Sequence, residues 1–153
     1  MKIKTEREYM ASVFDVAKYI LSKTGRISTM KLQKLCYYSQ AWSLAWTEKP
    51  LFDEEIQAWI NGPVCPELFK QHKGMFLVTE SDISCGNADR LSFDQKDTID
   101  RVLSYYADWE PYQLREQTHH EDPWINAREG IPPTENSTQV ITHESMGAYY
   151  GNL

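Results

Sequence analysis

The chain has 153 residues, of which 41% are hydrophobic and 12% are aromatic, and its formal net charge is −6. This length is typical of one domain, and the composition supports a sizeable core, which excludes a chain that is disordered throughout. The acidic charge disfavours nucleic-acid binding, because neutralising phosphates requires a basic face. The three cysteines are too few and too widely spaced for a disulfide framework, and they indicate reduced thiols.

No part of the sequence is suited to secretion or to a membrane. Residues 1–9 are charged and lack the apolar centre of a signal peptide. No apolar run approaches the roughly 20 residues that a membrane-spanning helix needs. We therefore predict a cytoplasmic protein with no membrane partner. We expect one domain over residues 1–153, with residues 1–8 as a frayed lead-in.

Two helices are predicted in the first third of the chain. Ser12 can cap the first, with Asp15 three residues later, and Gly25 ends it. Its apolar stripe consists of Val13, Val16, Ala17, Ile20 and Leu21. The second runs from Ser28 or Thr29 to about Glu48. Bulky side chains occupy several of its faces, which is typical of a central helix.

Short elements are predicted in the middle of the chain. Residues 55–60 alternate in the manner of a strand, and Asn61-Gly62-Pro63 has the chemistry of a turn. Pro66 suits the first turn of a short helix that ends near Gln71. Residues 76–78 and Ile83 are candidates for further short strands. A turn is expected at residues 87–90.

The last third is predicted to be mostly helical. Helices are expected from about Asp94 to Ala107, from Pro111 to Thr118, and after Thr142, with Pro123 breaking the pattern between them. Residues 132–138 read as a polar loop. The predicted fold class is mainly α (α+β). It is a compact bundle of about six helices around a central aromatic-rich helix, with a small two- or three-stranded β element.

A metal site is the first catalytic possibility to weigh, because His119, His120, Glu121 and Asp122 are consecutive. Adjacent histidines on a helix point about 100° apart, whereas metal-binding pairs usually lie four residues apart. Cys65 lies beside a predicted helix start, a position that lowers a thiol pKa, yet no histidine is placed beside it. Phosphate-binding loops and nucleophile elbows are absent. We therefore predict no enzyme activity, no catalytic residues, no metal and no cofactor.

The aromatic content exceeds what a core of this size requires, with nine tyrosines, five tryptophans and five phenylalanines. Most of these side chains are expected in the core. Tyrosine and tryptophan also anchor many protein interfaces. Candidates for that role are Trp46, Trp59, Trp109, Tyr149 and Tyr150.

Three blocks of sequence together carry a family resemblance. They are MKLQKLCYYSQAW at residues 30–42, PLFDEEIQAW at 50–59 continuing into NGPVCPEL at 61–68, and a sparse third block. The third block consists of Leu114, Thr118, His119, Glu121, Pro123, Trp124, Ala127 and Arg128. In order and spacing they resemble the Panacea-domain family, which includes SocA-like antitoxins and GepA-like phage-associated proteins. The resemblance extends from about Asp15 to Tyr150.

The resemblance implies a helical antitoxin that neutralises a cognate toxin by binding it. In one branch of the family the antitoxin is an adaptor that delivers the toxin to an ATP-dependent protease, so both proteins are expected partners. Nucleic acid is not an expected partner, and the sequence sets no oligomeric state. The motif residues are expected to be structural: Lys31, Leu32, Gln33, Lys34, Leu35, Tyr38, Gln40, Trp42, Thr118, His119, Glu121, Pro123, Trp124 and Arg128.

The partner surface is predicted at the turn and loop after the strand at residues 55–60, together with the last helix. Its residues are Trp59, Asn61, Gly62, Pro63, Cys65, Pro66, Glu67, Tyr149 and Tyr150. Three alternatives rank below an antitoxin. They are a phage accessory protein that binds a host factor, a metal-dependent hydrolase, and a DNA-binding regulator acting through Lys31, Lys34 and Arg128.

Overall fold

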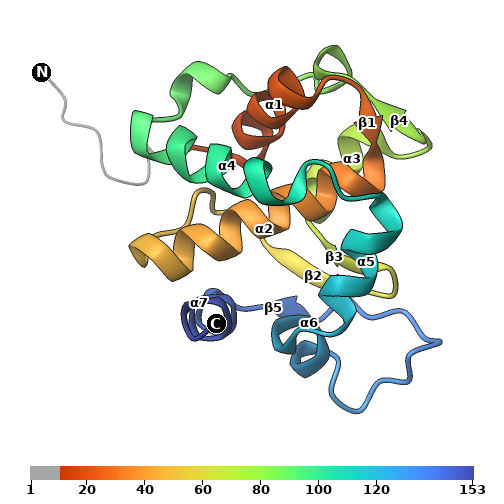
Figure 1. Cartoon of the computed structure of the whole chain (residues 1–153). Coiled ribbons are helices and arrows are strands. Elements are labelled where there is room, and N and C mark those ends of the chain that lie inside the picture. The colour runs from red at the N-terminus through yellow and green to blue at the C-terminus, as the bar shows by residue number, and fades with distance from the viewer. Residues whose placement is uncertain (1–10) are drawn as a thin grey trace, which may run out of the picture.

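The computed structural model describes residues 11–153 (Figure 1), and the predicted lead-in at residues 1–8 lies outside them. Seven α-helices are present in this part of the chain. They are α1 (Val13–Thr24), α2 (Thr29–Thr47), α3 (Pro66–His72), α4 (Phe93–Tyr106), α5 (Pro111–His119), α6 (Asp122–Ala127) and α7 (His143–Gly151). The predicted fold class, mainly α with a small β element, is confirmed.

The strands are short and form two antiparallel sheets. They are β1 (Ile27–Ser28), β2 (Ile56–Trp59), β3 (Gly62–Val64), β4 (Leu77–Val78) and β5 (Val140–Ile141). β1 pairs with β4, and β2 lies between β3 and β5. In the second sheet Trp59 is opposite Gly62 and Ile56 is opposite Ile141. The C-terminal part of the chain is thereby attached to the central hairpin.

Helix α2 is the centre of the fold, as predicted. It packs against α1, α4, α5 and α7, and it lies between α4 and α7 in Figure 1. All residues from Leu32 to Ala41 are buried, including polar ones. A helix that is buried on every face must satisfy its polar side chains inside the protein.

The helix ends follow the local signals in the sequence. Ser12 and Asp15 form a reciprocal capping box, in which the Asp15 carboxylate accepts from the Ser12 backbone N–H at 2.8 Å. The same carboxylate accepts from the Asn87 backbone N–H at 2.6 Å, which holds the loop before α4 against α1. Gly25 ends α1, and Ser28 caps α2. These predictions are confirmed.

Three local predictions are wrong, those at Gly62 and Pro63, at Ile83 and at Pro123. Gly62 and Pro63 belong to strand β3, whose position at the sheet edge tolerates a proline without a backbone N–H. Ile83 is a buried residue after a 3₁₀ helix (Glu80–Asp82) and not part of a strand. The turn predicted at residues 87–90 is present, because the Arg90 backbone N–H donates to the Asn87 carbonyl at 3.1 Å, and it belongs to a second 3₁₀ helix (Ala88–Arg90). Pro123 does not break a helical pattern, because it lies in the first turn of α6, where its missing N–H costs nothing.

Replacing Gly62 with alanine is expected to destabilise the protein by about 2–4 kcal/mol, because strain and overpacking add. Gly62 has φ +116°, and an added Cβ would lie 2.5 Å from Lys34 Cε, on a side chain that is fully buried. Chemical denaturation measures the loss. Gly74→Ala is the matched control: φ there is +86° with no atom within 4 Å, so only about 1 kcal/mol is expected. Equal losses in the two variants would contradict the assigned contact.

Candidate functional site

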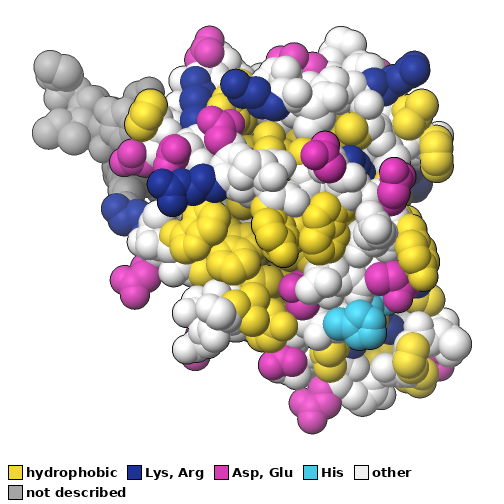
Figure 2. All heavy atoms as spheres, viewed as in Figure 1, with side chains coloured by type: hydrophobic (Ala, Val, Ile, Leu, Met, Phe, Trp, Pro, Cys, Tyr) yellow, Lys and Arg dark blue, Asp and Glu magenta, His cyan; other side chains and the backbone are white. Residues whose placement is uncertain are grey.

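A hollow of about 590 Å³ opens beside α2, and five of its eleven lining residues are aromatic. Trp42 and Trp46 come from α2, Tyr105 and Tyr106 from the end of α4, and Trp109 from the connection to α5. Figure 2 shows the hydrophobic side chains gathered in one band over this part of the surface. Trp46 is 47% exposed and Tyr105 is 65% exposed. The hollow therefore offers aromatic surface that the fold itself does not cover.

The aromatic rings of the wall hold one another in place. Tyr106 stacks on Tyr38 with ring centroids 4.1 Å apart, and its hydroxyl accepts from Trp42 Nε1 at 3.1 Å. The Trp42 and Trp46 rings lie 5.1 Å apart. Trp109 meets the edge of Tyr106 at 5.2 Å. The wall is therefore anchored in the core through Tyr38 and is set before any partner arrives.

Glu121 contributes a carboxylate to this aromatic hollow. Its Oε1 accepts from the hydroxyls of Tyr38 at 2.7 Å and Tyr150 at 2.8 Å, and its Oε2 accepts from Gln117 Nε2 at 3.1 Å. The Tyr150 hydroxyl in turn lies 3.0 Å from that of Tyr37. Burial raises the pKa of Glu121, and the three hydrogen bonds oppose this shift without cancelling it. The hollow thus combines aromatic faces with an acidic group.

Two glutamines of α2 bind the backbone of the segments before and after the β2–β3 hairpin. The Gln40 side chain accepts from the Leu51 backbone N–H at 2.7 Å and donates to the Phe52 carbonyl at 2.8 Å. The Gln33 side chain accepts from the Cys65 backbone N–H at 2.9 Å and donates to the carbonyl of the same residue at 3.3 Å. Seven residues, or two turns, separate the two amides. They place both ends of the β2–β3 hairpin against one face of α2.

Lys34 is a buried cation beneath this hairpin. Its Nζ donates to the Pro63 carbonyl at 3.4 Å, and its side chain lies against Gly62. Burial lowers the pKa of Lys34 to about 7, with a smaller contribution in the same direction from the nearby charge of Arg115. Lys34 is therefore withdrawn from the surface and does not belong to a basic patch.

The third sequence block fastens α6 to the hairpin. Trp124 Nε1 donates to the Trp59 carbonyl at 2.8 Å, and Arg128 donates to the Ala58 carbonyl at 3.0 Å. Arg128 also donates to the carbonyls of Pro132 and Glu135, and its guanidinium lies 4.9 Å from the Trp124 ring centroid. The arginine is buried by these contacts, which shape the loop before β5.

The four consecutive residues considered for a metal site do not converge. His119 stacks flat on Trp124 with centroids 3.9 Å apart, and burial lowers its pKa to about 4. Glu121 is engaged by the two tyrosines, while His120 and Asp122 are exposed. Within residues 11–153 no group of three or more His, Cys, Asp or Glu side chains is placed to hold a metal ion.

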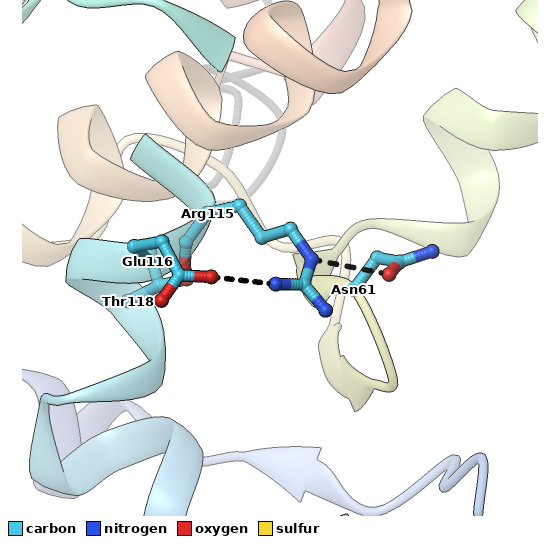
Figure 3. A network of polar contacts seen from close by, with 4 residues as sticks. All are labelled: Asn61, Arg115, Glu116 and Thr118. Atoms are coloured by element: carbon cyan, nitrogen blue, oxygen red, sulfur yellow. Dashed lines mark hydrogen bonds and ion pairs between the residues drawn. The ribbon is translucent and has the colours of Figure 1, made fainter. Parts of the chain in front are cut away.

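The hairpin tip is bound to α5 by an arginine (Figure 3). Arg115 Nε donates to the Asn61 side-chain oxygen at 3.2 Å, and the same guanidinium pairs with Glu116 at 2.8 Å. The Thr118 hydroxyl donates to the Arg115 carbonyl at 2.8 Å. This network holds the turn between β2 and β3 against α5.

The residues predicted to contact a partner are divided by the fold. Gly62, Pro63, Cys65 and Tyr150 are buried and offer no accessible side chain for a partner. The Cys65 pKa, expected to be lowered, is raised to about 11 by burial. The accessible members are Trp59, Asn61, Pro66, Glu67 and Tyr149. Contact between these five and a partner remains a prediction.

The family-motif residues are mostly inside the protein. Only Lys31, Trp42 and His119 are partly exposed, and the buried members are Leu32, Gln33, Lys34, Leu35, Tyr38, Gln40, Thr118, Glu121, Pro123, Trp124 and Arg128. The hollow was not predicted from the sequence as a unit, and Tyr105 and Gln117 were not among the predicted site residues. The available signal was the grouping of three aromatic residues, at positions 105, 106 and 109, around the end of a predicted helix.

Residues 32–125, more than half of the chain, match the family model of the antitoxin SocA-like, Panacea domain. The chain belongs to this family. The matched segment of this Panacea domain is shorter than the resemblance seen in the sequence, which runs from Asp15 to Tyr150. It contains the whole of the hollow's wall except Leu153, whereas Arg128 and α7 follow it. No curated protein and no solved structure matches the chain. Among residues 11–153, no helix of this Panacea domain combines the length and apolar character needed to span a bilayer.

The buried Lys34 predicts that stability rises with pH above neutrality. Between about 7 and 10.5 the unfolded chain keeps a proton on this lysine that the folded chain releases, so the free energy of unfolding increases with pH. The rise is at most about 1.4 kcal/mol per pH unit. Urea unfolding of the wild type and of Lys34→Met at pH 7 and pH 9 measures it. The methionine variant, similar in volume, is expected to lack this increment. Parallel pH profiles of the two proteins would contradict the buried lysine.

Proposed function

We propose that this chain is an antitoxin that neutralises a cognate toxin by binding it directly. The observation that carries the proposal is the match of residues 32–125 to the antitoxin SocA-like, Panacea domain. On this proposal the chain acts without catalysis and without a metal or cofactor, in the cytoplasm. The stacking of His119 on Trp124 and the hydrogen bonds of Glu121 and Lys34 within the fold fit a structural role for these groups.

The aromatic hollow supports a binding role. Partly exposed tryptophan and tyrosine side chains gathered in one depression are typical of the residues that dominate binding energy at protein interfaces. Trp46, Tyr105 and Trp109 have this character. Because they rest on the core through Tyr38 and Tyr106, little ordering entropy would be lost on binding. The net charge of −6 favours a basic partner.

The accessible residues of the β2–β3 hairpin and of α3 form a second proposed contact. Asn61 and Glu67 are exposed, and Trp59 and Pro66 are partly exposed. On α7, Tyr149 is partly exposed as well. The proposal assigns the larger share of the binding energy to the hollow, because its exposed aromatic area is greater.

Growth of cells that express the adjacent gene, with and without this chain, tests the proposal. We expect the neighbouring product to arrest growth and this chain to relieve the arrest. Trp46→Ala is expected to weaken toxin binding at least about 10-fold, as truncation of an anchor residue does. Phe76→Ala, the matched control, removes an aromatic side chain that is 80% exposed and lies outside the hollow, and it should keep full relief. A harmless neighbour that does not associate with this chain would refute the antitoxin proposal.

The fate of the toxin separates two ways of neutralising it. Sequestration predicts a stoichiometric complex that co-purifies and a toxin half-life that does not shorten. An adaptor role predicts that the toxin disappears faster when this chain is present, and that the loss requires an ATP-dependent protease. Toxin half-life in cells with and without the protease is the measurement.

A further inference from the structure

The chemistry of the hollow points to the charge of its occupant. Aromatic faces attract cations through their quadrupoles, and the attraction grows when water is excluded. Trp42, Trp46 and Trp109 line the hollow, and Glu121 adds a carboxylate to the same lining. A cation placed here would meet both attractions at once. Glu121 is only 3% exposed and its three hydrogen-bond donors are neutral, so an apolar occupant would supply no opposite charge to offset the burial of this group.

Three helix ends border the hollow with the same sign of partial charge. Trp46 lies in the last turn of α2, Tyr106 ends α4, and Leu153 follows the end of α7. Helix C-termini carry partial negative charge and favour cations. None of these three helices has a basic residue in its last turn. Within the part of the chain that the structure describes, the last turns of these helices therefore supply no basic side chain to complement their own partial charge.

The lining of the hollow includes one basic residue, Arg101, but its side chain does not complement these helix ends. Arg101 pairs with Asp97 at 3.1 Å along the outer side of α4, and both side chains are at least half exposed. Trp109 is flanked in sequence by Asp108 and Glu110, both exposed. The exposed charges next to Trp109 in the chain are therefore both acidic. Complementary charge of this kind steers a basic partner.

We propose that the hollow receives a lysine or arginine side chain from a basic segment of a partner protein. The inference rests on the proposed function only in assigning that side chain to the toxin. A volume of about 590 Å³ is within the range of sites that take drug-sized ligands, roughly 300–1,000 Å³, so the side chain can enter with some of its flanking backbone.

Titration of the whole chain with two small probes tests the hollow without a toxin. The probes are Nα-acetyl-lysine methylamide, whose side-chain ammonium is free, and Nα-acetyl-norleucine methylamide. They share an aliphatic stem and differ in charge. Their binding is followed by NMR through the indole N–H signals of Trp42, Trp46 and Trp109. We expect the lysine probe to bind in the millimolar range and the norleucine probe to bind about 5- to 10-fold more weakly. Equal or tighter binding of the norleucine probe would overturn the proposal, as would the absence of any shift with either probe.

Two variants locate the effect. Glu121→Gln keeps an oxygen acceptor for Tyr38 and Tyr150 and removes the charge, so it should weaken the lysine probe about 5- to 10-fold and leave the norleucine probe unchanged. Trp46→Ala, at a partly exposed position that tolerates truncation, should weaken the lysine probe as well. Phe76→Ala should alter neither. Near-ultraviolet circular dichroism checks the fold of each variant. Unchanged lysine binding in folded Glu121→Gln and Trp46→Ala would refute the site.

The outcomes distinguish this inference from the antitoxin proposal. Lysine-selective binding in a chain that relieves no toxicity would support the hollow and refute the assignment of its occupant to a toxin. Relief of toxicity by a chain whose hollow shows no preference for the lysine probe would refute the hollow and leave the antitoxin proposal standing.

Discussion

The burial of α2 on all sides from Leu32 to Ala41 is the constraint on which the rest of the structure depends. A buried helix can carry polar side chains only if each finds a partner, because an unpaired polar group in the interior costs about 1–3 kcal/mol. Gln33, Tyr38 and Gln40 meet this requirement by bonding to segments far along the chain. The course of the loop after α2, the hairpin and the start of α6 all follow from these bonds.

The same constraint shapes the surface. Tyr38 donates to Glu121 and stacks on Tyr106, so one core residue positions both the carboxylate and the aromatic wall of the hollow. A surface built this way is rigid before binding, which lowers the entropy lost on association. The residues that read in the sequence as structural family motif are therefore also those that prepare the candidate binding site. Tyr38 itself is fully buried in the core, whereas Tyr106, on which it stacks, lines the hollow.

The sequence was sufficient for elements that depend on local chemistry. The cap at Ser12, the stop at Gly25 and the apolar periodicity of α4 are all local, and the predictions made from them hold. Strand β5 was missed because two residues give no period, and its pairing with β2 is set by Arg128 and the loop it holds. The burial of Lys34 could not be predicted from the sequence, because a lysine is almost never fully buried in a folded protein. The hollow was missed because its walls come from α2, α4 and the chain's last residues, and only tertiary packing brings them together.

Hydrogen–deuterium exchange of the chain, alone and in complex with its toxin, shows whether the aromatic hollow is the surface that the toxin covers. We expect slower exchange in the complex at the end of α2 and across residues 105–110, where the aromatic wall would be covered. Little change is expected at Phe76, outside the hollow. Protection confined to the hairpin and α3, residues 61–67, with the hollow exchanging as in the free chain, would contradict this expectation.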